Sequence, residues 1–144
     1  MSKLKPQKSA KYGILNLNGY NETFPCIYQK GDFTEFEVST QKIGNMNMLL
    51  GGGYIRMLPW LFMKHMTQKY LDSGKPYVMY IHPIDLSPKS MPKVEGISFD
   101  RYLRTHIGRE DMVRRFKAVI KMLKKNGYEF VTFEELLKIY PAGT

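Results

Sequence analysis

At 144 residues and 16.8 kDa the chain has the length of one ordinary domain, so residues 1–144 are expected to form a single domain and a large multidomain enzyme is excluded. Cys26 is the only cysteine, which excludes a disulfide framework and a cysteine-based zinc site. The 22 Lys and Arg against 13 Asp and Glu give a net charge of +9, which favours a polyanionic partner. No apolar run is long enough to span a membrane and the chain start has no signal core, so we expect a cytoplasmic protein.

The first predicted elements are two strands joined by a turn. Residues 1–22 are rich in Lys, Asn and Gly and are expected to enter the fold as an irregular segment. β-Branched and aromatic residues crowd the runs 24–28 and 33–40, and Gly31 lies between them. This arrangement is typical of a β-hairpin.

A helix and a buried strand are expected next. Pro59 suits the first turn of a helix, so the apolar stretch after the glycines 51–53 predicts a helix over about 58–71, with Gly74 as its stop. The run 77–81 is short, apolar, rich in β-forming residues and flanked by prolines. It predicts a buried strand of a parallel sheet or barrel.

The C-terminal part predicts a loop, a helix, a strand and a second helix. Prolines and serines without periodicity indicate a long surface loop over 83–99. Apolar residues recur at helical spacing over 109–125, residues 129–131 suit a short strand, and Thr132 with Glu135 forms a capping box for a last helix. This alternation predicts an α/β layer with right-handed crossovers.

His82 is the first candidate for chemistry because it directly follows the predicted strand 77–81. Catalytic groups collect at the carboxyl ends of strands in α/β sheets and barrels, and an imidazole exchanges protons near neutral pH. The alternative is a histidine that only caps the strand end by bonding a backbone carbonyl. His65 and His106 have no partner at metal-ligand spacing, so both are expected to be structural.

Other motifs point less clearly to one function. The glycines 51–53 lack the spacing of a nucleotide loop and favour close approach of the backbone to a ligand or a neighbouring strand. Arg56 can face a carboxylate or substrate oxygens, and a structural ion pair is the alternative. Asp85 lies near His82, but no serine stands in a nucleophile-elbow sequence, so covalent catalysis is not expected. Basic patches and tyrosines suit single-stranded nucleic acid, yet no RNA-binding motif accompanies them, and nucleic acid is not the expected partner.

The runs Glu35–Thr40, Gly51–Pro59 and Tyr77–Pro83, in this order, resemble the C-terminal half of bacterial polysaccharide deacetylases, the carbohydrate esterases of the NodB-homology type. The similarity is closest to the branch associated with exopolysaccharide loci and covers nearly the whole chain. It implies an α/β fold that is part of a deformed (β/α) barrel. It also implies an enzyme that removes acetyl groups from N-acetylated polysaccharide or oligosaccharide.

The resemblance also implies roles for individual residues. His82 matches the family's late-strand histidine, the general acid for the leaving amine, and Glu35 stands near the acidic residue that orients it. Gly53 and Arg56 match the glycine-rich loop and are expected to shape the substrate-binding cleft. The branch usually has Trp-Glu after His-Pro, where this chain has Ile followed by Asp85, so Asp85 is expected at the substrate-binding lip.

The resemblance places the metal site outside this sequence. In the family an aspartate and a His-x-x-x-His pair in the N-terminal half bind the metal, and these motifs are missing from 1–144. We therefore expect no cofactor in this chain, a divalent metal such as zinc in the complete enzyme, and no activity from the chain alone. Self-association or pairing with a separate N-terminal metal-binding half is expected. A non-catalytic carbohydrate-binding or assembly module is the alternative.

Overall fold

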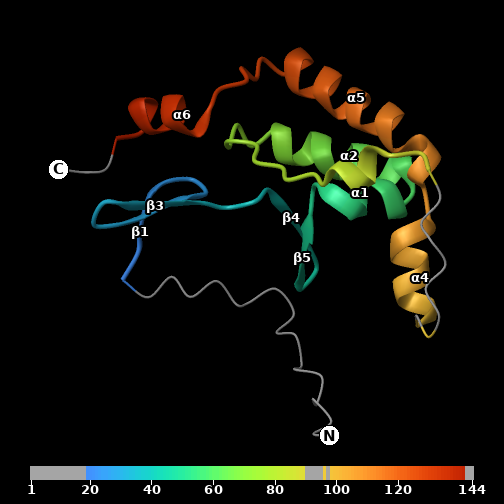
Figure 1. The fold of residues 1–144 in the computed structure, drawn as a ribbon. Helices are drawn as coiled ribbons and strands as arrows, with labels where there is room; N and C mark the ends of the chain where they lie inside the picture. The colour runs from blue at the N-terminus through green and yellow to red at the C-terminus, as the bar shows by residue number, and fades with distance from the viewer. Residues whose placement is uncertain (1–18, 90–95, 97, 142–144) are drawn as a thin grey trace, which may run out of the picture.

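The computed structural model describes residues 19–89, 96 and 98–141. Residues 1–18 of the expected irregular segment, and residues 90–95 and 97 of the expected long loop, lie outside the described residues. The elements follow one another along the chain as strands, then helices (Figure 1): β1 (Asn21–Phe24), β2 (Ile27–Lys30), β3 (Phe33–Phe36), β4 (Thr40–Ile43), β5 (Met46–Leu49), α1 (Gly52–Met57), α2 (Trp60–Leu71), α3 (Pro83–Leu86), α4 (Phe99–His106), α5 (Arg109–Lys125) and α6 (Phe133–Ile139).

The predicted hairpin is confirmed as β2 and β3, which pair antiparallel with Lys30 opposite Phe33. Gly31 lies in the turn with φ +54, a conformation that glycine adopts without strain. The prediction was wrong in placing Phe24 and Ile27 on one strand. The chain turns at Cys26, whose φ is +68, so Phe24 ends a separate antiparallel strand, β1, in the order β1-β2-β3.

Helix α6 packs on the three-stranded sheet through aromatic rings (Figure 1). Phe36 and Phe133 lie 4.8 Å apart between ring centroids, and Phe24 stacks on Tyr140 at 4.0 Å. The capping box that predicts α6 is confirmed, because the Thr132 hydroxyl accepts from the Glu135 amide at 3.2 Å and Glu135 Oε2 accepts from the Thr132 amide at 2.7 Å. Local sequence therefore sets where α6 begins, and aromatic packing attaches it to the sheet.

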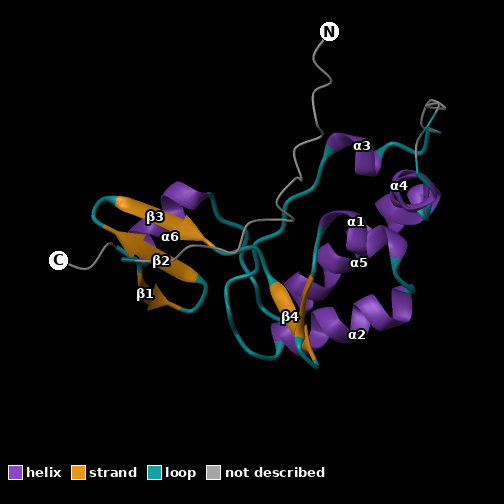
Figure 2. Cartoon of the chain, turned by 90° about the horizontal axis from the view of Figure 1, so that it is seen from below, coloured by secondary structure: helices purple, strands orange, loops and turns teal. Residues whose placement is uncertain are grey.

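The main hydrophobic core lies between the β4–β5 hairpin and helices α1, α2 and α5, which lie close together in Figures 1 and 2. Each fully buried aliphatic side chain there contributes about 1.5–3 kcal/mol. The core side chains are Met48, Leu50, Ile55, Met63, Met66, Tyr70, Leu71, Met112, Val119 and Leu123. Helix α5 has the predicted bounds. The helix predicted over about 58–71 is α2, but it begins at Trp60, and Pro59 is its N-cap and not part of its first turn.

Three predicted elements are corrected by the structure. Residues 77–81 and 129–131 form no strand, and the predicted loop 83–99 contains α3 and the start of α4. A strand needs a neighbouring backbone along its length. Ser39 donates its amide to the Val78 carbonyl and accepts the Val78 amide on its hydroxyl, both at 2.9 Å, but no strand ladder between described residues extends from this contact.

The α/β class is confirmed, but both described sheets are small and antiparallel. Among the described residues no parallel sheet and no closed barrel forms. None of the described helices is long and apolar enough to cross a bilayer.

Candidate functional site

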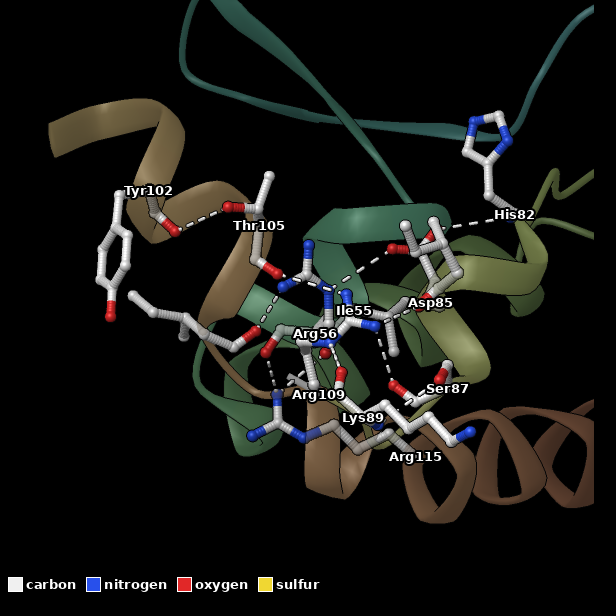
Figure 3. A network of polar contacts seen from close by, with 12 residues as sticks. Ile55, Arg56, His82, Asp85, Ser87, Lys89, Tyr102, Thr105, Arg109 and Arg115 are labelled. Carbon is white, nitrogen blue, oxygen red and sulfur yellow. Dashed lines mark hydrogen bonds and ion pairs between the residues drawn. The ribbon is translucent and has the colours of Figure 1, made fainter. Parts of the chain in front are cut away.

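His82 stands at the residue before α3, with extended backbone dihedrals of φ −90° and ψ 144°. Its side chain is exposed, and its ring meets the Tyr80 ring edge to face with centroids 5.4 Å apart. Figure 3 shows the imidazole turned away from Asp85 and Arg56. The ring is therefore accessible to a molecule outside the protein.

The backbone of His82 is held by Asp85. The Asp85 Oδ2 atom accepts the His82 amide at 3.3 Å, and the Asp85 amide donates to the His82 carbonyl at 2.8 Å. Pro83 starts the short helix α3 because its fixed φ suits a first helical turn. Asp85 is only 6% exposed, so its carboxylate contacts protein groups beneath His82.

Arg56 from α1 joins Asp85 from the other side. Its Nε atom lies 3.5 Å from Asp85 Oδ1, its Nη1 atom donates to the Ile107 carbonyl at 2.5 Å, and the side chain is 5% exposed. Burial lowers the pKa of Arg56, Asp85 raises it in part, and nearby Arg109 lowers it further. Of the two alternatives for Arg56, contact with a substrate or a structural ion pair, this geometry corresponds to the ion pair.

The glycine-rich segment approaches the chain just before His82. A Cβ atom on Gly51 would lie 2.7 Å from Met79 Cγ, and Gly52 has φ +51 beside the Tyr80 ring. This is the close approach to a neighbouring segment that the glycines predict. Gly53 is different, because a Cβ there would lie 3.7 Å from Arg56 Nη2, an ordinary contact distance.

Two further arginines hold the same region, and the sequence analysis missed both (Figure 3). Arg109, 7% exposed, donates to the carbonyls of Ile84, Ser87, Lys89 and Thr105 at 2.8, 3.0, 3.0 and 3.3 Å. Arg115 Nη1 donates to the carbonyls of Ile55, Arg56 and Leu58 at 2.8, 3.1 and 2.8 Å. These bonds tie the ends of α3 and α1 to α5.

A sequence signal existed for Arg115 but not for Arg109. Arg115 follows Met112 by three positions and precedes Val119 by four, so helical spacing places it on the buried face of α5. Arg109 opens the helix, where a cation is unfavourable next to the helix dipole, and nothing local marks it as buried.

Glu35 is the predicted site residue that the structure does not bring to His82. It is half-buried in β3, opposite Tyr28 of β2. Figure 2 shows β3 and α3 in separate parts of the molecule. The structure thus brings together His82, Asp85, Arg56 and Gly53, and leaves Glu35 apart.

The described residues do not fit a metal site of the kind the resemblance implies. Within them, no group of three or more His, Cys, Asp or Glu side chains is placed to hold a metal ion. His65 is exposed on α2, and His106 Nδ1 lies 2.9 Å from both the Tyr102 carbonyl and the Thr105 hydroxyl.

Comparison with known proteins identifies the family. A family described as a domain of unknown function, DUF3473, matches residues 2–138, so the chain belongs to this family. No curated protein and no solved structure matches the chain.

Proposed function

We propose that this chain is the C-terminal part of a metal-dependent polysaccharide deacetylase of partial-barrel architecture, and that His82 is its general acid. The single observation that carries the proposal is the exposed imidazole of His82 on a backbone fixed by Asp85. In this role a ring nitrogen of His82 gives its proton to the nitrogen of the departing amine. General acid catalysis of this kind contributes about 10²–10⁴-fold to rate.

The buried polar groups around His82 support the same proposal. Asp85 fixes the His82 backbone, Arg56 holds Asp85, and Arg109 bonds the carbonyls that follow in α3. A proton donor has to stand at a defined place relative to the leaving group. This network supports the backbone at His82, and Gly53 lies against Arg56 within it.

The metal of such an enzyme would be bound by another protein segment or chain. We therefore propose that the chain is inactive alone and pairs with a metal-binding N-terminal half. Two segments lining one groove, 76–79 and 128–131, belong to neither described sheet, and Phe130 is 57% exposed. The first segment overlaps the predicted strand 77–81 and the second contains the predicted strand 129–131, so this face suits a partner that provides neighbouring backbone.

The test is deacetylation of chitooligosaccharides with zinc or cobalt, before and after mixing with an N-terminal half from a deacetylase of the resembling type. We expect activity only in the mixture, and a loss of about 10²–10⁴-fold with His82→Ala. His65→Ala, which removes an exposed histidine on α2, is the matched control and should keep full activity.

The second candidate is a non-catalytic carbohydrate-binding or assembly module. It is favoured by the position of Glu35, which leaves His82 without the orienting carboxylate that the resemblance implies. If the mixture gives no deacetylation while the chain binds oligosaccharide, this second function replaces the first.

A further inference from the structure

A polar groove lies between the hairpin β4–β5, the turn around Cys26 and the C-terminal end of α2. It has a volume of about 460 Å³, which falls within the range of about 300–1,000 Å³ for small-ligand sites. Figure 2 shows β4 beside α2, away from α3. None of the residues lining the groove belongs to the His82 cluster.

The groove is positively charged. Three lysines line it against one carboxylate, Glu37: Lys42 from β4, Lys69 from the last turn of α2 and Lys75 from the segment that follows α2. None of the three lysines makes an ion pair with a described residue. Glu37 already accepts a hydrogen bond from the Tyr28 hydroxyl at 3.3 Å, and burial together with Glu37 raises the pKa of Tyr28 to about 12. Cations gathered around one groove repel each other, and a bound anion relieves this repulsion.

The remaining polar lining suits hydroxyl-rich ligands. Thr40 and Ser73 offer hydroxyls, and Gln41 and Asn47 offer amides that both donate and accept. The Ser73 hydroxyl donates to the Tyr70 carbonyl at 2.6 Å, which leaves its oxygen free to accept from a ligand. These groups match the alternating donors and acceptors of sugar rings.

The one aromatic ring at the groove disfavours nucleic acid. Tyr70 is 4% exposed, its hydroxyl donates to the Pro76 carbonyl at 2.8 Å, and its ring packs edge to face on Tyr77. A ring held in this way offers no face on which a base could stack, and stacking supplies much of the affinity for single strands.

We propose that this groove binds a stretch of acidic oligosaccharide, whose carboxylates contact Lys42, Lys69 and Lys75 while its hydroxyls contact the neutral side chains. The anionic character of the ligand follows from the lysines. The choice of a sugar chain rests in part on the proposed function, because a polysaccharide deacetylase has to hold its substrate chain at more than the reacting sugar.

The test is calorimetric titration of the full chain with tetragalacturonate, an oligomer of uronic acids. The groove variant combines Lys42→Ser, Lys69→Ser and Lys75→Ser. The control removes the same charge from the exposed face of α5 through Lys117→Ser, Lys121→Ser and Lys124→Ser. We expect the groove variant to bind about tenfold or more weakly and the control to stay within about twofold of the unchanged chain. Added salt should weaken binding to the unchanged chain.

Each of the following results would overturn the proposal: no binding of tetragalacturonate, equal losses in the two triple variants, equal affinity for neutral chitotetraose, or tighter binding of an oligothymidylate. Inorganic phosphate is a further arm, and phosphate binding as tight as that of the oligosaccharide would reduce the groove to a general anion site and also overturn it. Circular dichroism checks that both variants fold. The titration measures binding and not catalysis. A failure of deacetylation in the mixed halves would therefore not change the binding result, and a failure of the groove to bind tetragalacturonate would not change the deacetylation result.

Discussion

At the scale of single residues, Gly108 has the tightest surroundings of any described glycine. Its φ is +68, and a Cβ would lie 2.1 Å from the Arg56 carbonyl oxygen. Gly108→Ala is expected to lower the free energy of unfolding by about 3 kcal/mol, because both the backbone conformation and the clash oppose it. Gly127→Ala is the control, since Gly127 has φ +78 with nothing within 4 Å, and should cost about 1 kcal/mol. Urea unfolding measures both. If Gly108→Ala and Gly127→Ala lowered the free energy of unfolding by the same amount, the close contact between Gly108 and Arg56 would be contradicted.

Arg109 is expected to hold α3 in place. Arg109→Met removes the guanidinium donor from the carbonyls of Ile84, Ser87 and Lys89 and should lower the free energy of unfolding by about 2–4 kcal/mol. Arg109→Lys should recover only part of this, because an ammonium cannot reach all the carbonyls that the planar guanidinium bonds. Arg114→Met, at an exposed arginine paired with Asp111, is expected to cost less than about 1 kcal/mol. Similar values for Arg109→Met and Arg114→Met would contradict the role of Arg109.

At the scale of elements, the start of α6 should be sensitive to acid. Hydrogen bonds from the Thr132 backbone and hydroxyl lower the pKa of Glu135 below its ordinary 4.5. The carboxylate therefore stabilises the folded form above about pH 4.5, and this stabilisation is lost as the pH falls through the lower folded-state value. Amide exchange should show α6 opening first in acid, and Glu135→Gln should remove the pH dependence. Glu129→Gln, outside the helix, should leave it intact. If the opening of α6 in Glu135→Gln still depended on pH as in the unchanged chain, the Glu135 carboxylate would not be the acid-sensitive group.

The elements that could be predicted are those encoded by local sequence. Helix α5 follows from its apolar periodicity, and α6 follows from the pair Thr132 and Glu135. The segment 77–81 has a strand-like composition, but whether it becomes a strand depends on neighbouring backbone, and among the described residues it joins no sheet. Helix α3 was missed because its four residues, which begin at Pro83, are too few to show a periodic pattern.

The candidate site was predictable to a similar extent. Position after an apolar run identified His82, and sequence proximity made Asp85 and Arg56 candidates. Their connection through an ion pair depends on how α1 packs against α3, which no local pattern encodes. The same holds for Arg109, and for the separation of Glu35 from His82.

At the scale of the whole molecule, exposed apolar side chains suggest an association surface. Phe130 and Phe133 are each 57% exposed beside the groove that residues 76–79 help to line. We expect light scattering to give a mass above that of a monomer, and Phe130→Ser to lower it, because burying apolar surface drives association. Phe99→Ser is the control, since Phe99 is 75% exposed on α4. A folded monomer at every concentration would contradict this expectation.

The central claim is that His82 donates a proton, and the pH profile of deacetylation by the mixed halves tests it most directly. A general acid acts in its protonated form, so activity of the unchanged chain should decline towards alkaline pH. His82→Ala should be slower and should not show that fall, whereas His65→Ala should keep the unchanged profile. If His82→Ala retains both the rate and the alkaline decline, His82 is not the acid.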